Sequence, residues 1–307
     1  MNSKSKPHAV QGLWCAMLTP IAPDGGVDHA RFVRHAQALL AQGVDGVAPF
    51  GTTGEGQSFS LKERSDGLAA LLAGGIPPER VVAATGCAAL TETIALTRES
   101  VHAGCAGCLV LPPFFFKGVS DDGLYAWYAR VIEAVADPRL RIFLYHIPQV
   151  SGIPLSVDLV ARLASAFPGV MAGVKDSEGN WSNTSALLER VPHLAILVGH
   201  EPHLPRLLRA GGAGTICGVA NAYPDIVRAL LSPSVTPADE ERIATFISVL
   251  FEYPFLSAFK AIVAAQTADP GWRALRPPWI ELPETAQQRL LGALEQAGMR
   301  VRPSPAV

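Results

Sequence analysis

The sequence has no excess of charge of one sign and no long apolar run. Its 25 Lys and Arg residues nearly balance 27 Asp and Glu residues, giving a formal net charge of −2. Without a basic surplus, we expect no general attraction to nucleic acid or to an anionic membrane. No stretch reaches the roughly 18 consecutive apolar residues of a membrane span, and residues 1–8 lack the apolar segment of a signal peptide. These absences predict a cytoplasmic protein whose partner is a small molecule, with no nucleic acid and no membrane.

Cysteine is also scarce. The five cysteines are an odd number spread among apolar neighbours, which favours reduced, buried thiols over a disulfide framework. Cys105 and Cys108 have the C-x-x-C spacing, but there is no second such pair to complete a zinc site. His200, Glu201 and His203 do not match H-E-x-x-H, because a proline intervenes and the histidines are only three positions apart. We therefore expect no metal site.

Nucleotide-binding and nucleophile motifs are missing as well. The glycines at 51, 54 and 56 do not have the G-x-G-x-x-G spacing, and no Gly-Lys-Ser/Thr follows them. No G-x-S-x-G nucleophile elbow is present. The sequence thus gives no support for a bound dinucleotide, a P-loop or a serine hydrolase, and we expect no cofactor.

What the sequence does contain is a regular alternation of short apolar segments with helical patterns. Strict alternation with nearly continuous apolar strands predicts a parallel sheet covered by helices. Eight units fit an α/β fold of the (β/α)8 TIM barrel type, with an open doubly wound sheet as the alternative. The expected strands are 12–18, 44–50, 81–84, 107–111, 141–145, 170–174, 195–198 and 214–217. The expected helices are 28–41, 60–72, 92–102, 121–136, 156–166, 182–191, 201–210 and 225–231.

The pattern divides the chain into three parts. Residues 1–11 are expected to form a flexible leader, and residues 12–235 the (β/α)8 barrel. Residues 236–307 are expected to form a C-terminal helical region packed on the barrel, with helices at 240–253, 255–266 and 283–298. Barrels of this kind often reach such a length as one domain.

The most informative stretch is residues 169–180, where an apolar run ends in Lys175 and polar residues follow. A lysine among apolar side chains loses the hydration that favours its charged form, and its amine can then attack a carbonyl carbon. Tyr145 ends another apolar run thirty positions earlier, an interval that fits one β-α-β unit. The phenol and the amine are therefore expected at the same end of one sheet. Taken alone, such a lysine is more often a solvated strand end than a catalyst.

Other unusual residues also follow the predicted strands. Residues 51–56, Gly-Thr-Thr-Gly-Glu-Gly, form a tight turn with two hydroxyls and exposed amides, which suits a carboxylate. Aromatic and polar residues follow further strands at 112–116, 145–148, 199–201 and 216–221. Each of these segments alone could be a simple turn or packing element. In (β/α)8 barrels the active site lies at the C-terminal ends of the strands, so their shared location predicts a site.

These segments resemble those of the dihydrodipicolinate synthase/N-acetylneuraminate lyase family over roughly residues 12–298. Residues 51–55 are similar to the family's carboxylate-binding turn, and residues 173–176 to its Schiff-base lysine segment. Residues 145–148 resemble its Tyr-Asn-x-Pro segment, with His146 in place of asparagine. The resemblance implies a (β/α)8 barrel with C-terminal helices, assembled as a homotetramer that is a dimer of dimers. It implies no cofactor other than the covalent imine on Lys175.

The resemblance also implies a role for each candidate site residue. Lys175 forms the imine with pyruvate or another 2-oxo acid, and Tyr145 transfers protons to and from the substrate. Thr52 connects Tyr145 to the rest of the proton relay. Thr53 and the amides of the turn that begins at Gly51 hold the carboxylate. The rest of the substrate pocket is formed by residues that follow three later strands, namely Ser177, Gly199, Glu201 and Ile216.

Two departures from the family pattern concern the second substrate. Synthases of the lysine pathway have an arginine where this chain has Val150, and a tyrosine from a neighbouring subunit where it has Phe115. Valine cannot bind a carboxylate, and phenylalanine has no proton to transfer. We therefore predict a Schiff-base-forming lyase or aldolase that acts on pyruvate or a 2-oxo-3-deoxy acid, by aldol cleavage, condensation or dehydration. The alternatives are 4-hydroxy-tetrahydrodipicolinate synthase, which joins pyruvate to aspartate semialdehyde, and a non-catalytic barrel that binds 2-oxo acids.

Overall fold

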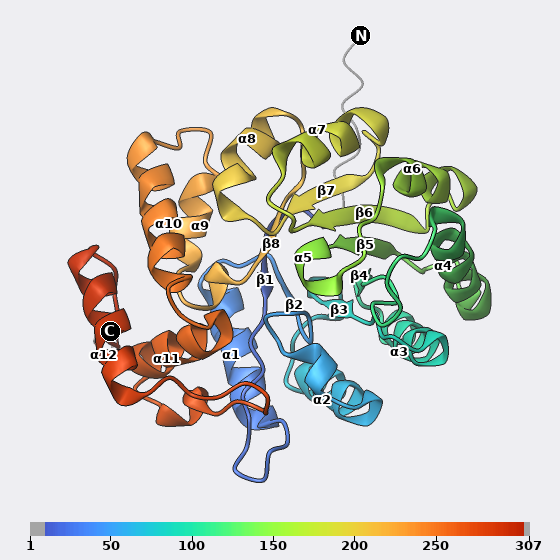
Figure 1. Cartoon of the computed structure of the whole chain (residues 1–307). Helices are drawn as coiled ribbons and strands as arrows, with labels where there is room; N and C mark the ends of the chain where they lie inside the picture. Colours follow the sequence, from blue (N-terminus) through green and yellow to red (C-terminus); the bar gives the residue numbers. More distant parts are fainter. Residues whose placement is uncertain (1–9, 304–307) are drawn as a thin grey trace.

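The computed structural model describes residues 10–303, and most of the predicted leader lies outside this range. Eight parallel strands lie in the order β2-β1-β8-β7-β6-β5-β4-β3, and a bridge between Val47 and Val81 joins the two ends. Helices surround the strands, which confirms the predicted (β/α)8 barrel (Figure 1). The strands are β1 Gly12–Ala16, β2 Gly46–Ala48, β3 Val82–Ala84, β4 Gly107–Val110, β5 Ile142–His146, β6 Met171–Asp176, β7 Ala195–Val198 and β8 Gly214–Cys217.

The helices of the barrel follow the predicted order, and side chains at their N-termini explain where several begin. Ser60 caps α2 in a capping box with Glu63, and Asp28 caps α1 by accepting a hydrogen bond from the Arg31 amide at 2.9 Å. The helices are α1 His29–Ala41, α2 Leu61–Ala73, α3 Leu90–His102, α4 Asp121–Val135, α5 Pro148–Ser151, α6 Val157–Ala166, α7 Trp181–Arg190, α8 Leu204–Arg209 and α9 Pro224–Leu230. Short 3-10 segments are η1 Gly56–Ser58, η2 Pro78–Arg80, η3 Glu201–His203, η4 Val219–Asn221 and η5 Pro270–Arg273.

Three local differences from the predicted elements have physical reasons. The helix expected at 201–210 is divided into η3 and α8, because Pro205 has no amide proton to continue the hydrogen bonds of the preceding turn. The single turn α5 was not predicted, since four residues are too few to show a helical period. Strand β6 continues through Asp176, so Lys175 lies within the strand rather than just after it.

The core has two layers, one inside the barrel and one between the sheet and the helices. Side chains alternate between them along each strand. In β5, Ile142 and Leu144 belong to the layer under the helices, whereas Phe143 and Tyr145 belong to the inner cluster. This alternation directs Tyr145 into the barrel, where the inner cluster also contains Ile216 of β8.

The C-terminal helices α10 Pro237–Leu250, α11 Phe255–Thr267 and α12 Glu284–Gln296 gather on one side of the barrel, as predicted (Figure 1). Helix α10 contacts α9 and α12, and α11 contacts η5. No single helix of the described chain is long and apolar enough to cross a bilayer. Helices α10 and α11 meet the length and composition requirements only as a pair, which is bent by 112°.

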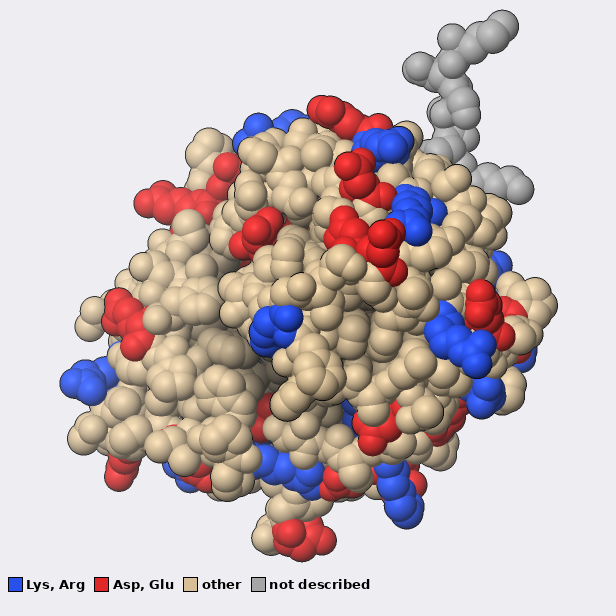
Figure 2. Space-filling view, turned by 45° about the vertical axis from the view of Figure 1, so that its right-hand side comes forward, with Lys and Arg blue, Asp and Glu red and all other residues tan. Residues whose placement is uncertain are grey.

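Acidic and basic side chains are mixed on the part of the surface that Figure 2 shows. On the face shown in Figure 2, residues of both signs alternate with uncharged ones, without a large area of one sign. This distribution agrees with the nearly balanced composition.

Candidate active site

Lys175 and Tyr145 lie next to each other on neighbouring strands. The two residues are register partners in the β5–β6 pairing, which confirms that adjacent strands bring the amine and the phenol together. The Lys175 Nζ donates a hydrogen bond to the Tyr145 Oη at 3.2 Å and lies 4.3 Å from the centre of the tyrosine ring. Both residues are buried, with relative exposures of 4% and 2%. An amine this sheltered from water is in the environment that a Schiff-base lysine requires.

Thr52 extends this pair into a row of three polar groups. Its Oγ1 lies 3.2 Å from the Tyr145 Oη, and either hydroxyl could donate the hydrogen bond. The phenol therefore contacts the amine on one side and a hydroxyl on the other. Such an arrangement can move a proton to or from a group bound at Lys175.

Gly199, at the end of β7, gives the lysine side chain its space. A Cβ atom at this position would lie 2.0 Å from the Ser177 Oγ and 3.2 Å from the Lys175 Cε. A larger residue would therefore displace the serine and press on the lysine. Glycine is needed here for its size and not for an unusual backbone conformation.

The turn after β2 has an unusual backbone. Phe50 and Glu55 both adopt left-handed conformations, with φ angles of 58° and 54°. The Gly56 amide donates to the Gly51 carbonyl at 3.0 Å, and the Glu55 amide donates to the Thr52 carbonyl at 3.1 Å. Two non-glycine residues in this region store local strain, which persists only where the surroundings hold the turn.

A buried ion pair supplies part of that support. The Lys260 Nζ of α11 lies 2.5 Å from the Glu55 Oε1, and both side chains are fully buried. The same ammonium donates to the Ala274 carbonyl at 2.8 Å. Burial lowers the pKa of Lys260, and the Glu55 carboxylate opposes that shift. A helix of the C-terminal region is thus tied to the turn that was predicted to bind a carboxylate.

Two cavities meet at Tyr145. The first has a volume of about 340 Å³ and contains Lys175; the second, here called the apolar cavity, has a volume of about 490 Å³. Both linings are mainly apolar, and that of the second is more so. Residues that line both are Thr52, Tyr145, Gln149, Val150 and Phe255. Further residues of the first include Thr53, Ile147, Lys175, Ser177, Glu178, Gly199, His200, Glu201, Ile216, Gly218 and Val219, together with Ile247, Leu250, Phe251 and Phe259 of the C-terminal region. Further residues of the second include Gly51, Glu55, Gln57, Leu109, Leu111, Phe114, Leu256 and Trp279.

Every candidate site residue from the sequence borders one of these cavities. Gly51 lines the apolar cavity, and Thr52 and Tyr145 line both. The remaining candidates line the cavity that contains the amine, namely Thr53, Lys175, Ser177, Gly199, Glu201 and Ile216. The structure therefore brings residues from five different strand ends to one place, within reach of a single small molecule.

Glu201 is a buried carboxyl group in this cavity, with a relative exposure of 6%. Burial raises the pKa of Glu201, and a hydrogen bond from the Val219 amide at 3.5 Å opposes this shift. Burial lowers the pKa of the neighbouring His200. Both shifts favour the neutral form, so these two side chains are suited to hydrogen bonding with an uncharged polar ligand.

Three contributors to the site were not found from the sequence. Lys260 could have been suspected, because it is the one charged residue in the apolar helix α11. Gln149 donates to the Ser177 carbonyl at 2.6 Å and joins α5 to the end of β6, a contact with no sequence signal. Glu178 borders the cavity, but it appeared in the sequence only as one of several polar residues after Lys175.

No cysteine among residues 10–303 lines either cavity, although Cys217 hydrogen-bonds the Glu201 carboxyl group from outside. All five cysteines are free, and all except the half-buried Cys105 are buried, so the prediction of reduced, buried thiols holds for four of them. Burial raises the pKa of Cys105 to about 12 and that of Cys108 still further. Neither member of the C-x-x-C pair therefore carries a reactive thiolate near neutral pH.

Comparison with known proteins agrees with this geometry. The model of the dihydrodipicolinate synthetase family matches residues 9–297. The chain is 35% identical to an uncharacterized DapA-like lyase of Chloroflexus aurantiacus, covering 90% of this chain and 89% of that protein. It is 30% identical to a 4-hydroxy-tetrahydrodipicolinate synthase of Neisseria meningitidis, covering 94% and 99%. The crystal structure of a dihydrodipicolinate synthase from Agrobacterium tumefaciens superposes with a TM-score of 0.89 at 39% identity, covering 94% and 99%. The chain belongs to the dihydrodipicolinate synthetase family and is an enzyme of its lyase and aldolase class.

Proposed function

We propose that this enzyme forms an imine between Lys175 and a 2-oxo acid, and that it cleaves, forms or dehydrates 2-oxo-3-deoxy acids through this imine. The observation that carries the proposal is the buried Lys175 Nζ, 3.2 Å from the Tyr145 Oη, in a cavity large enough for a small organic acid. The class I chemistry of the family supports the same conclusion.

The proposed steps use groups already in contact. The uncharged amine adds to the C2 carbonyl, and a proton from Tyr145 allows the resulting hydroxyl to leave as water. The protonated imine then withdraws electrons from the bond between C3 and C4. That bond breaks as the C4 hydroxyl gives its proton to the Tyr145 phenolate left by the first step, which releases an aldehyde and leaves an enamine. Tyr145 returns this proton to C3, and water then hydrolyses the protonated imine to pyruvate and free Lys175, giving the released proton back to Tyr145.

We further propose that the turn at residues 51–56 holds the C1 carboxylate, with Thr53 as a contact. Thr53 is buried and lies beside Gly218 at the mouth of β8. Fixing the carboxylate while Lys175 holds C2 defines the orientation of the bond that breaks. Thr52 then serves the proton relay, since its hydroxyl contacts the phenol.

Reductive trapping tests the imine. Incubation with pyruvate and borohydride is expected to add a stable mass to a peptide that contains Lys175, because reduction makes the C–N bond permanent. Lys175→Ala should remove the adduct, whereas Lys62→Ala, at an exposed lysine, should keep it. No adduct in the native enzyme, or an adduct that persists in Lys175→Ala, would show that the proposal is wrong.

A second candidate function is 4-hydroxy-tetrahydrodipicolinate synthase, the activity in the name of the Neisseria relative. The residues at two positions argue against it: Val150 borders both cavities and provides no charge, and Phe115 has no hydroxyl. Condensation of pyruvate with aspartate semialdehyde separates the candidates. Efficient turnover would favour the synthase, and its absence together with pyruvate release from 2-oxo-3-deoxy acids would favour the lyase.

A further inference from the structure

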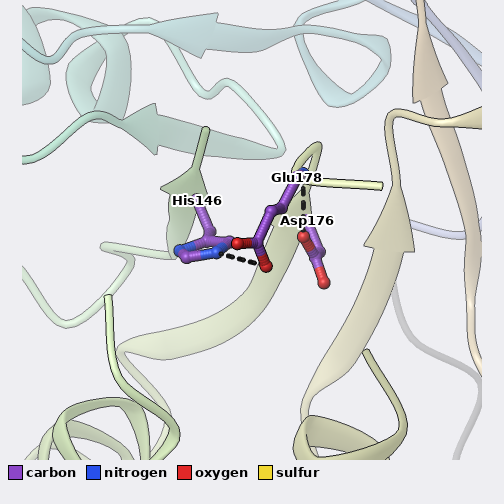
Figure 3. Close-up of side chains that lie close together, drawn as sticks. All are labelled: His146, Asp176 and Glu178. Atoms are coloured by element: carbon purple, nitrogen blue, oxygen red, sulfur yellow. Dashed lines mark hydrogen bonds and ion pairs between the residues drawn. The ribbon is translucent and has the colours of Figure 1, made fainter. Parts of the chain in front are cut away.

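His146, Asp176 and Glu178 gather at the ends of β5 and β6, beside the cavity that contains Lys175 (Figure 3). Their candidate ligand atoms lie within 4.8 Å of one another. His146 is almost fully buried, and its Nε2 lies 3.4 Å from the Glu178 Oε2. Such a group could bind a metal ion or could be a hydrogen-bonded network, and the contacts around it decide between the two.

The contacts favour the network. The Leu155 amide donates to the His146 Nδ1 at 3.0 Å, so Nδ1 is the acceptor and the proton of the neutral ring lies on Nε2. A protonated Nε2 donates to Glu178 and cannot bind a metal. The Asp176 oxygens also have partners: they accept hydrogen bonds from the Glu178 backbone amide at 3.1 Å, the Asn183 side-chain amide at 3.0 Å and the Thr184 hydroxyl at 2.8 Å.

The network fixes Glu178 from two directions. Asp176 holds its backbone amide, and His146 donates to its side-chain carboxylate. The carboxylate lies between the other two side chains in the close-up view (Figure 3). Its side chain keeps 32% of its surface exposed and borders the cavity. The structure thus places an oriented carboxylate at the edge of the substrate cavity.

Positive charge is rare around both cavities. Among the described residues that line them, Lys175 is the only lysine or arginine, and its amine is the group that forms the imine. Burial lowers the pKa of His200, so this ring is neutral at neutral pH. Lys117 lines neither cavity, and its ammonium already donates to the carbonyls of Phe114 and Ser151. A second negative charge on the substrate would therefore meet Glu178 without a cation to pair with it.

We propose that Glu178, oriented by His146, selects 2-oxo-3-deoxy acids whose far end carries hydroxyl groups rather than a second negative charge. This proposal rests on the function proposed above. A carboxylate accepts hydrogen bonds from hydroxyls and repels carboxylates and phosphates. With C1 held at the turn and C2 at Lys175, we place the remaining carbons toward Glu178, which lines the same cavity as Lys175. Glu178 is thus a specificity-determining residue, and His146 a positioning residue.

The test compares two acids that differ only at C6, 2-oxo-3-deoxygluconate with a terminal hydroxyl and 2-oxo-3-deoxyglucarate with a terminal carboxylate. The readout is the concentration of each acid that gives half-maximal borohydride trapping on Lys175, which does not depend on which bond later breaks. The native enzyme should require about tenfold more of the diacid, the ratio that corresponds to about 1.4 kcal/mol. Glu178→Gln should bring the two concentrations close to each other, and His146→Asn should have a smaller effect in the same direction.

Glu189→Gln is the matched control, because it removes the same charge from an exposed position on α7 and should leave the ratio unchanged. A second measurement needs no variant: the ratio in the native enzyme should fall as ionic strength rises, since salt screens an exposed charge.

A native ratio near one, a ratio insensitive to salt, or a Glu178→Gln enzyme with the native ratio would each overturn the proposal. These results are distinct from failure of the proposed function, in which pyruvate itself would leave no adduct on Lys175.

Discussion

Tyr145 is the residue whose removal tests the proposed proton relay. Its hydroxyl contacts both the Lys175 amine and the Thr52 hydroxyl, so Tyr145→Phe removes the group between them without changing the ring. General acid–base catalysis typically contributes about 10²- to 10⁴-fold. We expect kcat to fall by roughly 100-fold or more while borohydride trapping of pyruvate persists. Tyr125→Phe, at a half-buried ring on α4, serves as the control, and unchanged turnover in Tyr145→Phe would exclude the phenol from the relay.

We expect His35 to give the protein a pH-dependent stability that is separate from catalysis. Its Nε2 lies 2.9 Å from the Asn221 Oδ1, and burial lowers the pKa of His35 to about 4. Between about pH 6.5 and pH 4 the unfolded chain binds a proton that the folded chain does not. The free energy of unfolding therefore falls as the pH drops through this window, by up to about 3 kcal/mol.

Urea unfolding at pH 7.5 and at pH 4.5 measures this effect. His35→Gln should weaken the loss of stability between the two pH values, whereas His29→Gln, at an exposed position, should leave it unchanged. An equal loss in the native and His35→Gln proteins would assign the pH dependence to other groups.

At the level of residues, the sequence predicted the burial and strand position of side chains whose surroundings are formed by their neighbours in the chain. Lys175 and Tyr145 each end an apolar run, so their burial and strand position follow from neighbouring residues. The orientation of Glu178 is different, because it depends on the His146 tautomer and therefore on the Leu155 amide. A hydrogen bond between residues 32 positions apart has no signature in a single sequence.

Among the elements, α11 and the turn after β2 are joined by the buried Glu55–Lys260 ion pair. Removing one member of such a pair leaves an isolated buried charge, which typically costs roughly 3–5 kcal/mol. We expect Glu55→Gln and Lys260→Met each to lower the free energy of unfolding by about this amount. The double variant should recover most of the loss, because neither charge then remains unpaired. Urea denaturation of the three variants measures these differences.

The exposed pair Lys62–Asp66 on α2 is the control for this experiment. Its charged atoms lie 2.7 Å apart, but the two side chains are 82% and 44% exposed, so Lys62→Met should cost less than about 1 kcal/mol. Glu55→Gln and Lys260→Met should each also raise the pyruvate concentration that gives half-maximal trapping, because a less rigid turn holds the carboxylate less well. Purely additive stability losses in the double variant would show that the two residues are not coupled.

The elements themselves were predicted where capping residues and apolar periodicity agree. Ser60 and Asp28 marked the starts of α2 and α1 correctly, because their side chains satisfy amides of the first turn. The contact of α11 with the turn could not be predicted, since the two segments are about 200 residues apart and meet only after the barrel closes. The division of η3 from α8 depends on Pro205, which a periodicity argument overlooked.

For the whole molecule, the alternation of apolar strands and helices was enough to predict the barrel and its C-terminal helices. Each β-α unit is short and local, and right-handed crossovers leave few ways to arrange eight of them. The assembly of several chains is not determined by this local pattern. It depends on the surface, where Phe115, Phe116 and Val150 are exposed apolar residues with relative exposures of 72%, 73% and 58%.

We propose that these three residues form part of a contact between copies of the chain in a homotetramer. The apolar cavity is lined by Val150 and by Phe114, which precedes Phe115 in the sequence, so a second copy covering Phe115 and Phe116 would also close that cavity to water. Light scattering should give a mass of about 130 kDa, that of four chains of 32.4 kDa each. Phe115→Glu combined with Phe116→Glu should lower this mass and reduce turnover, because charged side chains oppose the contact that completes the cavity. Ile280→Glu, at an exposed residue that lines neither cavity, should leave the mass unchanged, and a native mass in the double variant would place the contact elsewhere.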